Sequence, residues 1–262
     1  MTPNAMASTS HPLSTAAALD ILQQGGNALD AATAAVAVQC VVEPQSTSIG
    51  GDCFCLYAPA DRDEVIAING SGRTPAGMEA RWLREQGFDA SPQQSQHSAT
   101  APRAVDAWVT LNRDHGKMSL ADILAPSIGY ARDGYAITPR VAFDFAGCFD
   151  LLQGDGDASD VFLPEGGSLE AGDAHRQPAL ARTLSEIAEK GRDGFYKGWV
   201  AEDMLAKLKG LGGTHTQADL DNALATYVTT IKTNYHGYDI WECTPNGQGL
   251  MALLLLKMAD GR

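Results

Sequence analysis

The segment NGSGRTP, residues 69–75, contains the side chain that could most directly bind a substrate. An apolar run ends there, two glycines allow the chain to turn, and Arg73 follows just before the bend set by Pro75. The planar guanidinium of arginine suits bidentate binding of a carboxylate, which lysine does less well. An arginine on a glycine turn is also often an ordinary surface residue, so the spacing alone leaves both interpretations open.

Two further loops carry residue types found in ligand sites, but their spacing argues against a ligand. The loop SIGGD, residues 48–52, comes before an expected strand, whereas a phosphate-binding loop follows a strand and opens a helix. Its glycines instead predict a tight turn that lines a pocket. The acidic loop at residues 154–160 has calcium-like offsets but lacks the glycine and glutamate of an EF-hand, so we expect a solvated turn there.

Other catalytic and metal-binding patterns are missing from the sequence. There is no GxSxG elbow and no HExxH motif, and the six histidines are scattered. The five cysteines include no CxxC pair and have no zinc-like spacing. We therefore expect no metal site and no catalytic residue in this chain, and a reducing compartment.

The overall composition narrows the expected partners. The 262 residues are 44% apolar and 7% aromatic, and the net charge is −13. An acidic chain repels phosphate backbones, so nucleic-acid binding is disfavoured. The longest apolar run, Leu250 to Leu256, is too short to cross a bilayer, and no signal peptide is visible. We expect a cytoplasmic protein without a membrane partner.

The elements that must position Arg73 begin with two helices and a group of strands. A helix over residues 14–24 is expected to end at two glycines, and Asn27 is expected to cap a second, alanine-rich helix. Strands are expected at residues 41–42, 53–57 and 64–69. Consecutive strands joined by short turns predict an antiparallel sheet covered by helices.

The rest of the chain is expected to be mainly helical. Alternation around His236-Gly237 predicts one hairpin, formed by residues 227–235 and 238–243. Capping patterns and apolar periodicity predict helices at residues 104–115, 119–132, 179–190, 200–208 and 250–259, and another opened by residues 138–139.

Several segments, taken together and in order, resemble the gamma-glutamyltransferase family. They are SHPLSTAAALDILQQGGNALDAATAAVAV, VVEPQSTSIGGD, NGSGRTP, GKMSLADILAPSIGYARDGYAIT, GFYKGWVAEDMLAKLKGLGGTHTQADL and NYHGYDIWECTPNGQGLMALLLLKM. Single segments are weakly specific, but the ordered set covers nearly the whole chain. The chain is thus identified as similar to the N-terminal, large-subunit region of this family of N-terminal-nucleophile (Ntn) hydrolases.

The resemblance implies an α+β fold, the αββα four-layer sandwich of Ntn hydrolases, with residues 1–262 as a single partial domain. It implies a proenzyme that cuts itself into two subunits and acts on gamma-glutamyl compounds such as glutathione. The nucleophile would be the N-terminal threonine of the second subunit, with its own α-amine as base. That threonine would lie beyond Arg262, so the expected partner is the C-terminal half of the same proenzyme, and this chain alone is expected to be inactive. No cofactor is implied.

The resemblance also bears on individual residues. Arg73 matches the family's arginine that binds the α-carboxylate of the glutamyl group, while Gly50 and Gly51 match a glycine loop that we expect to shape the fold. The family usually shows V-P-G where this chain has Ala101-Pro102-Arg103, so the glycine that allows a close backbone approach is replaced.

Other interpretations stay open beside the gamma-glutamyl enzyme. The chain could be an inactive fragment whose exposed strand edges favour aggregation or a homo-oligomer. The protein could act on another small amide, as an acylase or amidohydrolase, or bind a small molecule through Arg73 without chemistry. A threonine-led segment encoded after residue 262 would favour the enzyme over the fragment.

Overall fold

The computed structural model describes residues 4–260, which form two compact units. The first unit comprises the residues up to Ser48 together with Asn112–Phe195. The second unit comprises Ile49–Leu111 together with the residues from Tyr196 onward. Each unit is therefore assembled from two separate stretches of chain, and the single partial domain over residues 1–262 stays a prediction.

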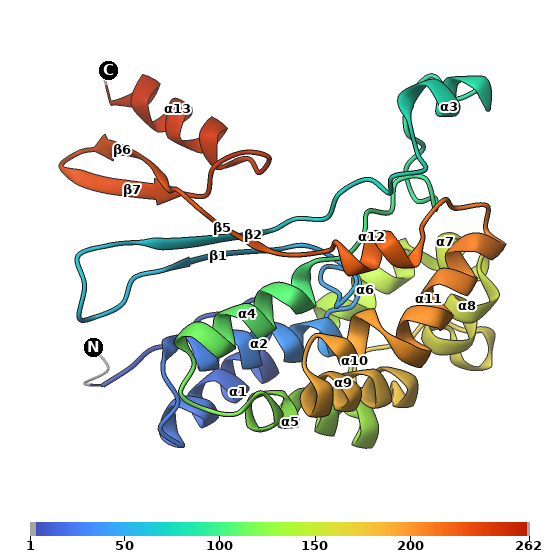
Figure 1. The fold of residues 1–262 in the computed structure, drawn as a ribbon. Helices are drawn as coiled ribbons and strands as arrows, with labels where there is room; N and C mark the ends of the chain where they lie inside the picture. The colour runs from blue at the N-terminus through green and yellow to red at the C-terminus, as the bar shows by residue number, and fades with distance from the viewer. Residues whose placement is uncertain (1–3, 261–262) are drawn as a thin grey trace. The chain divides into compact units, whose positions relative to one another are not determined.

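Helices make up most of the first unit (Figure 1). Helix α1 (Pro12–Gln23) packs on α2 (Ala28–Val42), and α2 in turn packs on α5 (Leu120–Asp133). Helix α5 also packs on α9 (Pro178–Lys190). Close packing is possible because the buried faces of α2 carry small side chains, and its residues Ala31, Ala34, Ala35 and Ala37 are all at most 5% exposed.

The expected cap of α2 is confirmed and is buried. The Asn27 side chain accepts hydrogen bonds from the main-chain N–H groups of Leu29 and Asp30, both at 2.9 Å. The Asp30 carboxylate accepts in return from the Asn27 N–H at 3.0 Å, which completes a capping box. Asp30 is only 1% exposed, and it also accepts from the main-chain N–H of Lys117 at 3.0 Å.

The strand expected at Val41-Val42 is wrong, because both residues are the last two of α2. Both are fully buried, and burial against neighbouring elements outweighs the modest strand preference of β-branched residues. The last four carbonyl groups of any helix lack an intrahelical hydrogen-bond partner. Here the Val41 carbonyl accepts hydrogen bonds from the Tyr135 hydroxyl and the Gln177 side chain, both at 2.7 Å.

The second stretch of the first unit adds short elements. They are β3 (Tyr135–Ala136), α6 (Pro139–Gly147), α7 (Phe149–Gln153), α8 (Gly156–Phe162), the 3-10 helix η1 (Pro164–Gly166), β4 (Ala174–His175), which pairs antiparallel with β3, and α10 (Asp193–Tyr196) at the boundary of the unit. The solvated turn expected at residues 154–160 is wrong, because α8 begins there. Asp155 caps this helix by accepting from the Ala158 N–H at 3.0 Å, so the acidic residues stabilise a helix start.

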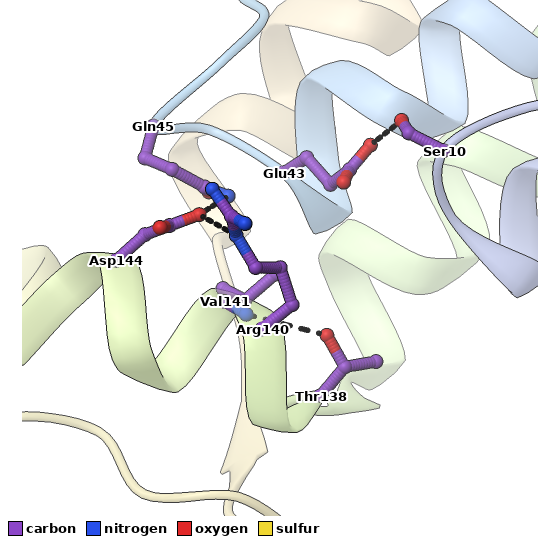
Figure 2. Close-up of polar contacts among 7 residues, drawn as sticks. All are labelled: Ser10, Glu43, Gln45, Thr138, Arg140, Val141 and Asp144. Carbon is purple, nitrogen blue, oxygen red and sulfur yellow. Dashed lines mark hydrogen bonds and ion pairs between the residues drawn. The ribbon is translucent and has the colours of Figure 1, made fainter.

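Polar contacts join α6 to the loop that follows α2 (Figure 2). Asp144 accepts hydrogen bonds from Arg140 at 2.9 Å and from the Gln45 side chain at 3.2 Å. The Ser10 hydroxyl donates to Glu43, the C-cap residue of α2. These contacts fix the end of α2 from both stretches of the first unit.

A three-stranded antiparallel sheet is the framework of the second unit. Its order is β1 (Cys53–Tyr57), β2 (Ile66–Gly70) and β5 (Thr226–Val228). Cys53 lies opposite Gly70 in the register, and Asn69 lies opposite Thr226. The expected antiparallel pairing is confirmed, with β2 starting and ending slightly later than expected.

The hairpin turn expected at His236-Gly237 is confirmed, whereas the expected start of its first strand at residue 227 is wrong. Strands β6 (Ile231–Tyr235) and β7 (Tyr238–Glu242) are joined by His236 and Gly237, which have φ angles of 50° and 86°. Such a two-residue turn with positive φ matches the twist of an antiparallel pair. The hairpin does not reach back to residue 227, because residues 226–228 pair with β2 instead. Helix α13 (Gly249–Ala259) packs against β6 and β7.

The other helices of the second unit are α3 (Ala80–Glu85), residues 104–111 of α4 (Ala104–His115), α11 (Gly198–Gly210) and α12 (Gln217–Asp221). Helix α4 agrees with its expected bounds, whereas α3 had no expected counterpart. Among residues 4–260, no helix combines the length and apolar character needed to cross a bilayer.

Candidate functional site

The NGSGRTP turn begins at the end of β2, on the central strand of the sheet. The Asn69 side chain accepts from the Ser71 N–H at 2.9 Å, which closes a local turn directly after the strand. The Asp52 carboxylate accepts from the Gly72 N–H at 2.7 Å. The turn is therefore held both by its own first residue and by the last residue of the SIGGD loop.

Gly72 is required by the close approach of a second segment. The Ala101 N–H donates to the Arg73 carbonyl at 2.9 Å, which forms an isolated antiparallel bridge. A Cβ atom at Gly72 would lie 2.2 Å from the Thr100 hydroxyl oxygen and 2.6 Å from the Ala101 carbonyl oxygen. Only glycine fits there without moving the backbone that carries Arg73.

The Arg73 side chain is exposed, and its donors are not used within the chain. Its main chain is fixed by the bridge to Ala101, yet no hydrogen bond or ion pair among residues 4–260 involves its guanidinium. A rigid backbone with unused donors is the arrangement expected of a ligand-binding arginine. Binding of a carboxylate by Arg73 stays a prediction.

Arg103 lies beside this turn and was not singled out as a binding residue from the sequence. It is 8% exposed, and its main-chain N–H donates to the Gly51 carbonyl at 3.3 Å. Burial lowers the pKa of the Arg103 guanidinium, and the positive charge of Arg73 lowers it further. The backbone bridge between Arg73 and Ala101 places Arg103, two residues further along the chain, next to the same turn.

Three segments far apart in the sequence meet at this site. Gly51 accepts from the N–H groups of both Arg103 and Ala104, so the SIGGD loop adjoins the start of α4. Asn246 contributes from the segment after β7, since its side-chain oxygen accepts from the Asn69 amide at 3.1 Å and from the Ser71 hydroxyl at 2.9 Å. In the sequence, Asp52 and Asn246 could have been identified as residues of this site only by their position next to glycine-containing turns.

The cysteines and histidines nearby are poor candidates for chemistry. Burial, together with the neighbouring Cys55, raises the pKa of the Cys53 thiol to about 12, so the nucleophilic thiolate is disfavoured. Burial also lowers the pKa of His215, whose ring nitrogen contacts the Ala99 carbonyl at 3.0 Å. Within residues 4–260 no group of three or more His, Cys, Asp or Glu side chains is placed to hold a metal ion.

The amino-acid sequence matches one protein family, both by its family profile and by individual relatives. The family profile described as Gamma-glutamyltranspeptidase matches residues 14–262. The chain is 34% identical to the glutathione hydrolase-like YwrD proenzyme of Bacillus subtilis and 34% identical to the oxamate amidohydrolase proenzyme of Klebsiella pneumoniae. These matches cover 95% and 97% of this chain but only 47% and 49% of the relatives. The chain therefore spans about half the length of the curated relatives it matches.

The structural comparison agrees with the sequence comparison. Helicobacter pylori gamma-glutamyltranspeptidase superposes on the chain with a TM-score of 0.94 at 28% identity, covering 100% of this chain and 76% of that one. The expected fold class, the N-terminal part of an α+β fold of the Ntn-hydrolase type, is confirmed.

Proposed function

Because the chain belongs to the gamma-glutamyltranspeptidase family, we propose that the whole protein is an amidohydrolase or acyltransferase acting on gamma-glutamyl amides such as glutathione. In this proposal Arg73 binds the α-carboxylate of the glutamyl group. One observation carries the assignment: Arg73 is exposed and unpaired among the described residues, on a backbone fixed by Asp52 and Ala101.

The proposed chemistry uses a threonine from the other half of the proenzyme. Its hydroxyl oxygen adds to the amide carbonyl while its α-amine accepts the hydroxyl proton. Collapse of the tetrahedral intermediate breaks the C–N bond, and the leaving amine takes that proton. Water or an acceptor amine then adds to the resulting ester and releases the threonine. Residues 1–262 contribute the scaffold and the carboxylate-binding arginine.

The relatives support a two-part protein. Both curated relatives named above are proenzymes, and this chain matches about half of each. We propose that residues 1–262 assemble with the C-terminal half of the same proenzyme and are inactive without it. None of the five cysteines forms a disulfide within residues 4–260, which supports our further proposal of a reducing compartment such as the cytoplasm.

Another small amide is the second candidate substrate. One relative is an oxamate amidohydrolase, so the family is not restricted to gamma-glutamyl compounds. The specific observation that favours this alternative is Arg103, a second cation that is 8% exposed and lies two residues from Ala101, the bridge partner of Arg73.

The test is replacement of Arg73 in the autoprocessed protein. A carboxylate held by two charge-assisted hydrogen bonds contributes about 2–4 kcal/mol, so Arg73→Ala should lower kcat/KM for a gamma-glutamyl amide roughly 30- to 900-fold. Most of the loss should appear in KM, because the carboxylate is bound alike in the ground and transition states. Arg73→Lys should recover part of it.

Arg84→Ala is the matched control, since Arg84 is another exposed arginine of the second unit. It should leave both constants unchanged. A folded, processed Arg73→Ala protein with the kinetics of the parent would refute the assignment of Arg73.

A further inference from the structure

The segment over residues 243–249 joins β7 to α13 and contacts the three-stranded sheet. At its start, the Cys243 sulfur lies 3.8 Å from the carbonyl oxygen of Cys55 and 3.9 Å from that of Ile68. Farther along, residues 247–249 and residues 54–56 of β1 line a cavity of about 360 Å³. Because the sheet leaves this space beside the later part of the segment, hydrogen bonds are needed to fix that part in place.

Asn246 makes the hydrogen bonds that tie this segment to the NGSGRTP turn. Its side-chain oxygen accepts from the Asn69 amide at 3.1 Å and from the Ser71 hydroxyl at 2.9 Å. The Asn69 side-chain oxygen accepts in turn from the Ser71 N–H at 2.9 Å. The result is a closed ring of hydrogen bonds, in which Ser71 is held through both its main chain and its side chain.

This ring lies two residues before Arg73. Within residues 4–260 no hydrogen bond or ion pair involves the Arg73 guanidinium, so its position depends on the main chain that carries it. Asp52 and Ala101 hold that main chain at two points, at 2.7 Å and 2.9 Å. Asn246 holds the start of the same turn, and it is the anchor that comes from the segment after β7.

We propose that Asn246 is a positioning residue, which holds the turn so that Arg73 meets the α-carboxylate of the gamma-glutamyl group. The inference rests on the proposed function, because it concerns the same site. Ser71 is 6% exposed, so loss of the Asn246 oxygen leaves its hydroxyl without an acceptor and with little access to water. The turn should then shift to satisfy that hydroxyl, and the guanidinium should move with it.

An ordinary structural contact would behave differently. If the Asn246 hydrogen bonds only stabilise the fold, their loss should lower the free energy of unfolding and leave KM unchanged. If they position Arg73, their loss should raise KM at nearly constant kcat, because the carboxylate is bound alike in the ground and transition states. The rise should also require that Arg73 is present.

The experiment is a double-mutant cycle on the full-length, autoprocessed protein, with steady-state kinetics on gamma-glutamyl-p-nitroanilide. Asn246→Ala should raise KM roughly five- to twentyfold and change kcat by less than about twofold. In the Arg73→Ala protein the same replacement should raise KM by no more than about twofold, because no guanidinium is left to misplace. Ser71→Ala removes one donor of the ring and should raise KM by a smaller factor than Asn246→Ala does.

Asn234→Ala is the matched control. Asn234 is also exposed, and its side chain makes two hydrogen bonds in the same unit, to Asp239 at 3.1 Å and from the Gly237 N–H at 3.2 Å. Its replacement should lower stability in urea unfolding about as much as Asn246→Ala does, while KM stays unchanged.

The outcomes are separable. If the parent hydrolyses the anilide but Asn246→Ala leaves KM unchanged, the inference is overturned and the proposed function stands. Equal increases in KM with and without Arg73 would also overturn it, because Asn246 would then act independently of the arginine. If Asn246→Ala does not fold, the same cycle with Ser71→Ala decides by the same criterion. A processed parent that does not act on gamma-glutamyl compounds would refute the proposed function, and the inference with it.

Discussion

Replacing Asp30 with alanine should destabilise the first unit far more than an ordinary cap mutation does. The Asp30 carboxylate accepts from two main-chain N–H groups, those of Asn27 and Lys117, at 3.0 Å each. The Asn112 amide donates to it as well, at 3.5 Å. Asp30 is 1% exposed, so these donors have little access to water once the carboxylate is gone.

The magnitude follows from the number of groups left unpaired. Loss of a helix cap costs about 1 kcal/mol, and each partly buried donor left without an acceptor costs about 1–3 kcal/mol. With two main-chain donors left unpaired, we expect Asp30→Ala to lower the free energy of unfolding by about 3–7 kcal/mol. Asp30→Asn keeps one acceptor oxygen and should cost roughly half as much.

The assay is urea unfolding followed by circular dichroism, and Ser119→Ala is the control. Ser119 caps α5 by accepting from the Asp122 N–H at 3.1 Å, but it is exposed. Its replacement should cost only about 1 kcal/mol. If Asp30→Ala costs no more than Ser119→Ala at an unchanged m-value, the buried contacts of Asp30 add nothing to stability and the reasoning is refuted.

Two further predictions concern the site and the response to pH. Gly72→Ala should raise KM for the acyl donor at least several-fold in steady-state assays. The added Cβ would lie 2.6 Å from the Ala101 carbonyl oxygen and would displace the backbone of Arg73. An unchanged KM would show that the position of this backbone is not critical for binding the acyl donor. Burial lowers the pKa of His175 in the folded protein below its unfolded value near 6.5. At acidic pH the unfolded state therefore binds more protons than the folded state, and the protein should lose stability as the pH falls below about 6.5. His175→Phe, which keeps the ring packing on Tyr135 and Phe162, should make unfolding midpoints measured from pH 7.5 to 5 less dependent on pH; an equal pH dependence in both proteins would contradict this.

Local features of the fold could be predicted from the sequence. The cap at Asn27 and the turn at His236-Gly237 depend on hydrogen bonds and φ angles within a few residues, and both were expected. Features set by distant parts of the chain could not. Val41 and Val42 stay helical because of burial, and residues 226–228 form a strand because they pair with residues 67–69.

The same distinction applies to the site. Arg73 could be selected because the residue type and its glycine turn are adjacent in the sequence. Arg103 stood out only as a departure from V-P-G, and its burial beside Arg73 depends on how the SIGGD loop meets the start of α4. Asn246 is separated from Ser71 by most of the chain, so no local pattern could indicate their hydrogen bond.

The interleaved order of the two units has a consequence for biosynthesis. Residues up to Ser48 belong with a stretch that ends at Phe195, so α1 and α2 leave the ribosome long before α5 and α9. At about 5–20 residues per second, the alanine-rich α2 waits on the order of 10–30 seconds before its unit can be completed. During that interval the second unit is also unfinished, because its last strands lie beyond residue 196. Until residue 195 has been made, the apolar faces of α1 and α2 lack the partners that cover them in the folded unit, and a chain ending at Phe195 would carry the whole first unit together with only the first stretch of the second.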